Sequence, residues 1–149
     1  MSDDFVGRHW TGFEEPDLLR MKLTGVVKEE EARELNRLHQ IYVAGRGRVF
    51  YLIDLSDLET IEPGARREAG DGLQQLDLGG IAIYKAPLKA RVLAKLIFTA
   101  MNMFRRGGIS QVPFEFHDSE AAARAWIASR RKRLEAEQPA PEAAAPALH

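Results

Sequence analysis

The stretch Val49–Arg66, VFYLIDLSDLETIEPGAR, decides the fold class. Its first five residues are continuously apolar, as in a central strand covered on both faces of a sheet, and we expect that strand to run over Val49–Leu55. Pro63 then suits the first turn of a helix, where its missing N–H is not needed. A buried strand followed by a tight loop and a helix is where α/β proteins usually carry their chemistry. Here, however, the loop enters the helix as EPGA, without Ser, Cys or His.

Hydrophobic strands and amphipathic helices alternate on both sides of this stretch. Strands are predicted where apolar residues run together or alternate, and helices where they recur every three or four residues. The order β-β-α-β-α-β-α-β-α predicts a single α/β sandwich with a mixed five-stranded sheet and about four helices. The predicted elements are, in chain order, strands at Phe5–Phe13 and Leu18–Gly25, a helix at Lys28–Val43, the strand Val49–Leu55, a helix from Pro63 to about Leu76, a strand at Gly79–Tyr84, a helix from Leu88 to about Phe104, a strand at Val112–Phe116 and a helix from Asp118 to about Glu135.

One folded domain and a tail account for the whole chain. The length of 149 residues suits one ordinary domain, and a hydrophobic content of 45% allows a substantial core. The C-terminal segment QPAPEAAAPALH is too rich in Pro and Ala to build a core. We therefore expect a domain over residues 1–137 and a disordered tail over residues 138–149.

Bulk composition narrows the class of protein. A net charge of −1 gives no support for a nucleic-acid partner. The absence of cysteine excludes disulfides, thiol catalysis and cysteine-bound zinc or iron–sulfur sites. The N-terminus has no signal-sequence pattern, and no apolar run approaches the roughly 18 residues of a membrane span. These features predict a cytoplasmic protein.

Motifs for catalysis and cofactor binding are missing from the sequence. A hydrolase elbow needs Gly-x-Ser-x-Gly, which the chain lacks. The four histidines do not fall at metal-ligand spacing, and no glycine loop has the Walker pattern. We therefore expect no enzymatic activity, no metal site and no cofactor.

Four segments between about Leu18 and about Ile127 resemble the STAS-like family, specifically its bacterial SpoIIAA-like branch. These segments are LTGVVKEEEARELNRL, VFYLIDLSDLETIEPGAR, LGGIAIYKAPLKARVLAKLI and FEFHDSEAAARAWI. The resemblance implies a STAS-like fold for residues 1–137 and a regulatory protein that docks on a partner protein. In anti-sigma-factor antagonists of this family, a Ser at the start of the second helix, in a motif like Asp-Ser-Ser-Gly, is phosphorylated. The added negative charge breaks the docking.

The usual phosphoacceptor of that motif is absent from this chain. Glu62, Pro63 and Gly64 stand where Asp-Ser-Ser would stand. Glu62 either mimics a permanent negative charge at a docking surface or merely favours the helix N-terminus. The hydroxyls that stay open as phosphorylation sites are those of Ser56, Thr60 and Ser119.

The predicted third helix carries the strongest binding signal. Residues 85–106 hold six basic residues and no acid. We expect Phe98 to lie on an exposed arc among cations, where an aromatic ring suits contact with an acidic partner or an anionic membrane surface. Alternatively, the last helix or a second copy covers Phe98. The arc would hold Arg91, Lys95, Asn102 and Arg105, opposite an inner face of Leu88, Val92, Leu93, Leu96, Ile97, Ala100, Met101 and Phe104.

Two functional hypotheses follow from these observations. The first is a non-enzymatic regulatory module that binds another protein, and self-association is a related possibility. The second is a carrier or sensor of a small apolar or lipid ligand, which an enclosed apolar cavity would favour and a packed core would disfavour. The docking surface of the first hypothesis comprises Glu62, Gly64, Arg66 and Arg67 at the helix start, with Arg91, Lys95, Phe98 and Arg105 on the third helix.

Overall fold

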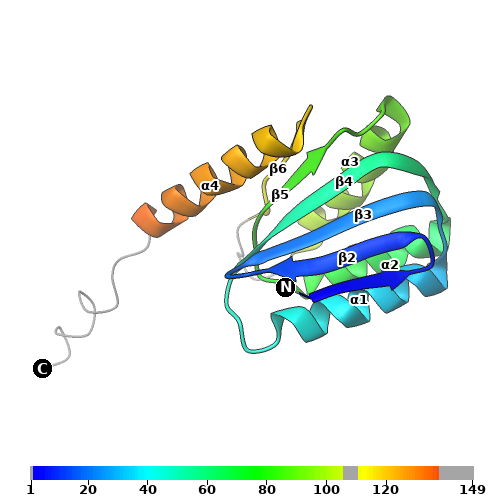
Figure 1. The fold of residues 1–149 in the computed structure, drawn as a ribbon, viewed down its shortest axis with the longest axis horizontal. Helices are drawn as coiled ribbons and strands as arrows, with labels where there is room; N and C mark the ends of the chain where they lie inside the picture. The colour runs from blue at the N-terminus through cyan, green and yellow to red at the C-terminus, as the bar shows by residue number, and fades with distance from the viewer. Residues whose placement is uncertain (1, 106–110, 138–149) are drawn as a thin grey trace, which may run out of the picture.

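A mixed six-stranded sheet organises the chain (Figure 1). The computed structural model describes residues 2–105 and 111–137. Its elements are β1 (Ser2–Val6), β2 (His9–Glu14), β3 (Leu18–Val27), α1 (Glu29–Val43), β4 (Val49–Ile61), α2 (Pro63–Gln74), β5 (Leu78–Tyr84), α3 (Leu88–Met103), β6 (Phe114–His117) and α4 (Glu120–Glu137).

The strands lie in the sheet in their sequence order, β1 to β6. β1 pairs with β2, and β2 with β3, in antiparallel orientation. The remaining neighbours, β3 with β4, β4 with β5 and β5 with β6, pair in parallel. α1, α2 and α3 connect the parallel strands. Because such crossovers are almost always right-handed, adding strands in one direction places all three helices on the same face. α4 covers the other face (Figure 1).

The predicted α/β sandwich with four helices is confirmed, but the sheet has six strands rather than five. The segment predicted as one strand, Phe5–Phe13, is a hairpin in which Phe5 of β1 pairs with Trp10 of β2. Gly7 sits in the turn with a φ of +60°, a left-handed conformation that glycine adopts without steric cost. The predicted tail, residues 138–149, lies outside the described residues.

β4 is longer than the sequence pattern predicts and runs to Ile61 instead of Leu55. The pairing of β3 with β4 shifts register between Lys22 and Thr24, and in this region Asp54 Oδ1 accepts the Ser56 N–H at 2.9 Å. Asp54 and Ser56 therefore lie within an irregular strand and do not mark its end. As a result, Glu62 alone separates β4 from α2.

Each face of the sheet has its own core, and β4 contributes to both. Tyr51 and Ile53 point into the larger core beneath α1, α2 and α3. Phe50 and Leu52 point into the smaller core beneath α4, where Ile127 packs. This alternation explains why a central strand reads as a continuous apolar run, as predicted.

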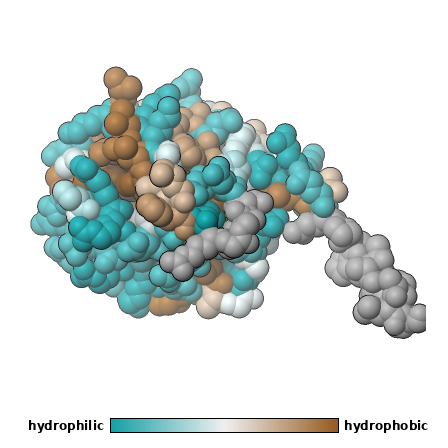
Figure 2. Space-filling view, turned by 180° about the vertical axis from the view of Figure 1, so that it is seen from behind, coloured by the Kyte–Doolittle hydropathy of each residue, from teal (hydrophilic) through white to brown (hydrophobic). Residues whose placement is uncertain are grey.

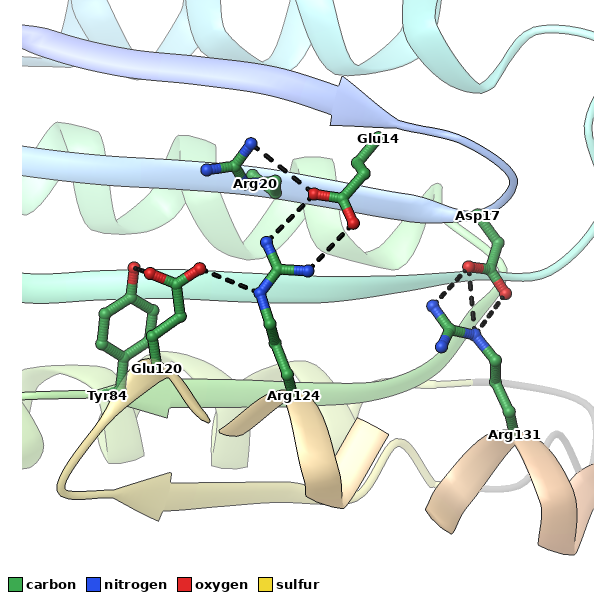
Figure 3. A network of polar contacts seen from close by, with 7 residues as sticks. All are labelled: Glu14, Asp17, Arg20, Tyr84, Glu120, Arg124 and Arg131. Carbon is green, nitrogen blue, oxygen red and sulfur yellow. Dashed lines mark hydrogen bonds and ion pairs between the residues drawn. The ribbon is translucent and has the colours of Figure 1, made fainter. Parts of the chain in front are cut away.

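Ion pairs attach α4 to the antiparallel end of the sheet (Figure 3). Arg124 donates from Nη1 and Nη2 to both carboxylate oxygens of Glu14, at 2.9 and 3.0 Å, and from Nε to Glu120 at 2.9 Å. Arg131 donates to Asp17 at 2.7 Å. α4 begins at Glu120 and is capped by Ser119, whose Oγ accepts the Ala122 N–H at 3.1 Å, and not by Asp118 as predicted.

Within the described residues, no helix is both long and apolar enough to span a lipid bilayer.

Candidate functional site

Helix α3 is rotated about its axis relative to the orientation that the sequence pattern predicts. Leu93, Ile97 and Met101 are buried as predicted, but the other residues of the predicted inner face are exposed: Leu88, Val92, Leu96, Ala100 and Phe104. The buried side chains of α3 are Ala90, Leu93, Ala94, Ile97, Phe98 and Met101. Phe98 is only 5% exposed, and its ring centroid lies 5.3 Å from that of Phe114 in β6. The prediction that Phe98 lies on an exposed arc is therefore wrong. The chain's own β6, and not the last helix or a second copy, covers part of the ring.

The opposite side of α3 exposes a row of large apolar side chains, here called the outer stripe. Leu88 is 78% exposed, Val92 50% and Leu96 59%, at spacings of one helical turn. Met103 and Phe104 extend the row at the helix C-terminus. Seen from the side of α1, α2 and α3, a brown hydrophobic strip crosses a mostly teal surface (Figure 2).

The orientation of α3 has a steric reason. The helix is apolar around most of its circumference, so hydrophobicity alone does not choose the buried side. The side that faces inward carries Ala90 and Ala94, which are nearly fully buried. Small side chains at these positions let the helix backbone approach the core closely. Leu88, Val92 and Leu96, which were predicted to face inward, are therefore left outside.

The cations of the predicted arc do not share one surface. Lys95 is exposed beside the outer stripe, as is Lys89. Arg91, in contrast, is half-buried and turned towards β6, because its Nε donates to the Ala86 carbonyl at 3.2 Å and its guanidinium lies 5.4 Å from the Phe116 ring centroid. Arg105 is half-buried at the end of a described segment. Two exposed lysines therefore flank the stripe.

The elbow before α2 combines exposed and structural residues. Glu62 and Arg67 are exposed. Gly64 is explained by packing of α2 against α1, since a Cβ at this position would lie 2.1 Å from Glu29 Oε1. Arg66 closes the strand-to-helix turn by donating from Nε to the Ile61 carbonyl at 2.8 Å. Only two of the four predicted elbow residues are thus fully available to a partner.

The proposed phosphorylation sites lie in ordered elements. Ser56 and Thr60 are half-buried on β4, and Ser119 caps α4. Phosphorylation at these hydroxyls stays a prediction.

A cavity of about 80 Å³ lies between the sheet and helices α1, α2 and α3. Its walls are mainly apolar and include Ile53 from β4, Leu73 from α2 and Ile97 from α3. Polar side chains enter at one part of the wall, where His39 of α1 meets Tyr51 of β4. The core therefore contains a cavity between the sheet and the helices, where the hypothesis of a small apolar ligand requires one.

Burial controls the ionisation of the cavity histidine. His39 is 4% exposed, and its burial lowers its pKa from 6.5 to about 4, so it is neutral at pH 7. His39 lies within the predicted helix Lys28–Val43, but its burial in the core was not predicted. The spacing from Ala32 and Leu35 to His39, three and then four residues, is the signal that it shares their buried side.

Among the described residues, no three His, Asp or Glu side chains gather in a way that could hold a metal ion.

The fold defines an α/β domain of the STAS-like type, and comparison with known proteins gives its family. The SpoIIAA-like family model matches residues 18–128. The chain therefore belongs to the SpoIIAA-like family, and the resemblance seen in the sequence is confirmed. No curated protein matches the chain.

A solved structure supports the fold independently. It is the crystal structure of an uncharacterised protein with a SpoIIAA-like fold from Shewanella loihica PV-4, which is 21% identical to this chain. The match has a TM-score of 0.55 and covers 85% of this chain and 98% of the other. At this identity the similarity shows a shared fold only and carries no information on activity.

Proposed function

We propose that the chain is a non-enzymatic, regulatory interaction module that docks on a partner protein through the outer stripe of α3. The exposed row formed by Leu88, Val92 and Leu96 carries this proposal. Exposed apolar side chains are common singly, but a contiguous row bordered by charged residues is typical of an interaction site. Lys89 and Lys95 border the row, so the matching partner surface is apolar and flanked by Asp or Glu.

The shape of the stripe suits a single partner element. α3 has 16 residues, which corresponds to a length of about 24 Å. Such a ridge fits against one helix or into one groove, with anchors one turn apart. Full burial of one Leu or Val side chain contributes about 1.5–3 kcal/mol before the costs of association. A few anchors of this kind account for a specific complex.

The charges around α3 favour a protein over a membrane as the partner. α1 and α2 belong to the same helix layer and expose charges of both signs, acids such as Glu30 and Asp71 and bases such as Arg33 and Arg67. A broad anionic lipid surface would meet these acids together with Lys89 and Lys95. A single acidic helix would instead meet only α3, because charges separated by more than about 8 Å are screened at physiological salt.

Site-specific photocrosslinking in the native cells tests the proposal. A benzophenone amino acid replaces Val92, and the same probe at the exposed Ala128 of α4 is the control. We expect one dominant protein adduct with the probe at Val92 and none with the probe at Ala128. The cross-linked segment of the partner should be apolar and flanked by Asp or Glu. The double change Lys89→Glu and Lys95→Glu should abolish it.

Three outcomes of this experiment would overturn the proposal. One is the same adducts at Val92 and Ala128. Another is an adduct that persists after the charge reversal. The third is cross-linking to lipid alone, which would identify the stripe as a membrane contact. The same probe at Arg67 tests whether the exposed elbow, with Glu62, extends the docking surface.

A further inference from the structure

We propose that the cavity beneath α1, α2 and α3 is a binding site for a small apolar molecule that carries one hydrogen-bond donor, an alcohol or a phenol. This site is separate from the outer stripe and does not depend on the docking proposal. It has the composition of a small-molecule site, with apolar walls and a few convergent polar groups.

A chain of hydrogen bonds fixes the polar part of the wall. The Thr11 hydroxyl donates to the Arg20 carbonyl at 2.8 Å, so its oxygen accepts from His39 Nε2 at 2.9 Å. The His39 ring is neutral with its proton on Nε2, and Nδ1 is therefore an acceptor. The Tyr51 hydroxyl has two acceptors in the wall, His39 Nδ1 at 3.2 Å and Met21 Sδ at 3.3 Å. Each proton in the chain thus has an acceptor within the protein.

The direction of this chain decides what a ligand must offer. Because the single hydroxyl proton of Tyr51 goes to an acceptor within the protein, His39 or Met21, its oxygen offers the cavity lone pairs but no proton. A hydroxyl or N–H on the ligand satisfies these lone pairs. A carbonyl or an ether would place two acceptors against each other, which costs free energy in a buried site.

The volume of the cavity limits the size of the ligand. A cavity of about 150 Å³ holds benzene in an engineered protein. At about 80 Å³, the cavity accommodates a short alcohol. A phenol fits only if one wall moves outward and enlarges the cavity by the volume of a few atoms.

α2 is the wall best suited to move. This helix contains Gly70, where nothing lies within 4 Å of the position a Cβ would take, and a glycine inside a helix weakens it relative to alanine. Gln40 of α1 and Ala69 of α2 line the cavity and retain solvent exposure. α1 and α2 therefore lie between this part of the cavity and the solvent.

Titration with phenol and toluene, two probes of nearly equal size, tests the site by amide chemical shifts in two-dimensional NMR. For the wild-type chain we expect saturable shifts at cavity-lining residues with both probes. Tyr51→Phe removes the acceptor and keeps the ring. It should weaken phenol binding about 3- to 10-fold and leave toluene binding unchanged, the loss expected for one neutral hydrogen bond.

A cavity-filling variant locates the binding site. Ala69→Leu should abolish the shifts with both probes, and Ala128→Leu on the exposed face of α4 should leave them intact. If circular dichroism shows that Ala69→Leu does not fold, Ala94→Val fills the α3 wall instead. The cavity site is overturned if neither probe gives saturable shifts or if the shifts survive filling. Equal weakening of both probes by Tyr51→Phe overturns the donor requirement.

Discussion

Helices α3 and α4 lie on opposite faces of the same sheet and are held by different forces. α4 buries little more than Ala123 and Ile127, and its arginines form ion pairs with Glu14, Asp17 and Glu120. α3 buries six apolar side chains and still exposes the outer stripe. Three arginines of α4, Arg124, Arg130 and Arg131, bind partners within the fold, whereas α3 leaves an apolar row and two flanking lysines exposed. This difference is the reason why we propose α3 as the docking helix.

The largest effect is expected for Phe98→Ala, which removes a buried ring from α3. Deletion of a core phenylalanine costs about 3–5 kcal/mol because it loses packing and leaves a cavity. Leu96→Ala, on the outer stripe of the same helix, should change the free energy of unfolding by no more than about 0.5 kcal/mol. Equilibrium denaturation of both variants measures the contrast, and similar losses would contradict the assignment of the two sides of α3.

The second effect is a pH dependence that separates the two faces. The pKa of His39 falls from 6.5 in the unfolded chain to about 4 when it is buried. His39 therefore costs no stability above pH 6.5, and as pH falls from 6.5 towards 4 the free energy of unfolding should decrease by about 3 kcal/mol. On the α4 face, the hydrogen bond from Arg124 holds the pKa of Glu14 below 4.5, so its contribution is lost only below that pH.

Urea denaturation at a series of pH values measures both windows. His39→Gln should remove the loss between pH 6.5 and 4, and Glu14→Gln should leave that window unchanged. An undiminished loss in His39→Gln would assign the pH dependence to another group.

A smaller effect distinguishes two glycines of α2. A Cβ on Gly72 would lie 2.2 Å from Asn36 Oδ1, while nothing lies within 4 Å of the same position on Gly70. Gly72→Ala must displace Asn36, whose side chain donates to the Glu68 carbonyl at 2.8 Å, and we expect a loss of about 1 kcal/mol. Gly70→Ala should instead raise stability by about 1 kcal/mol through helix propensity. Thermal unfolding checks the opposite signs, and equal signs would show that α2 does not pack closely on α1.

The smallest effect concerns the ion pair that attaches α4. Glu14 and Arg124 are both about one-third exposed, so solvent screens their attraction. A double-mutant cycle with Glu14→Gln and Arg124→Gln should give a coupling energy of about 0.5–1 kcal/mol that weakens as salt is added. A coupling that does not depend on salt would indicate that the pair acts through packing.

The central part of the fold was readable from the sequence because its signals are local. The apolar run in Val49–Leu55 marked a strand buried on both faces, and Pro63 marked the start of α2. Gly7 was the local sign of the hairpin that makes the sheet six-stranded instead of five-stranded. The apolar residues on either side of Gly7 are few, so the pattern does not divide them into two strands.

The candidate site was harder to predict because it depends on which side of a helix meets the sheet. α3 is apolar on two sides, and periodicity does not distinguish them. The small Ala90 and Ala94 determine the packing, and so Phe98 is buried while Leu96 is exposed. The burial of His39 follows from its helical spacing, but its partners Thr11 and Tyr51 could not be predicted, because they lie on strands 28 and 12 residues away in the sequence. Pairings of that kind leave no pattern within a single segment.

The pairing of Glu14 with Arg124 spans 110 residues, and that of Asp17 with Arg131 spans 114. On the ribosome, β2 emerges long before α4 has been synthesised. The parallel strands and their three crossover helices join neighbours in sequence, so they can assemble while the chain is still growing. The face of β4 and β5 that carries Leu52 and Ala82 stays uncovered until α4 arrives. Nascent chains are therefore most prone to aggregation in this interval.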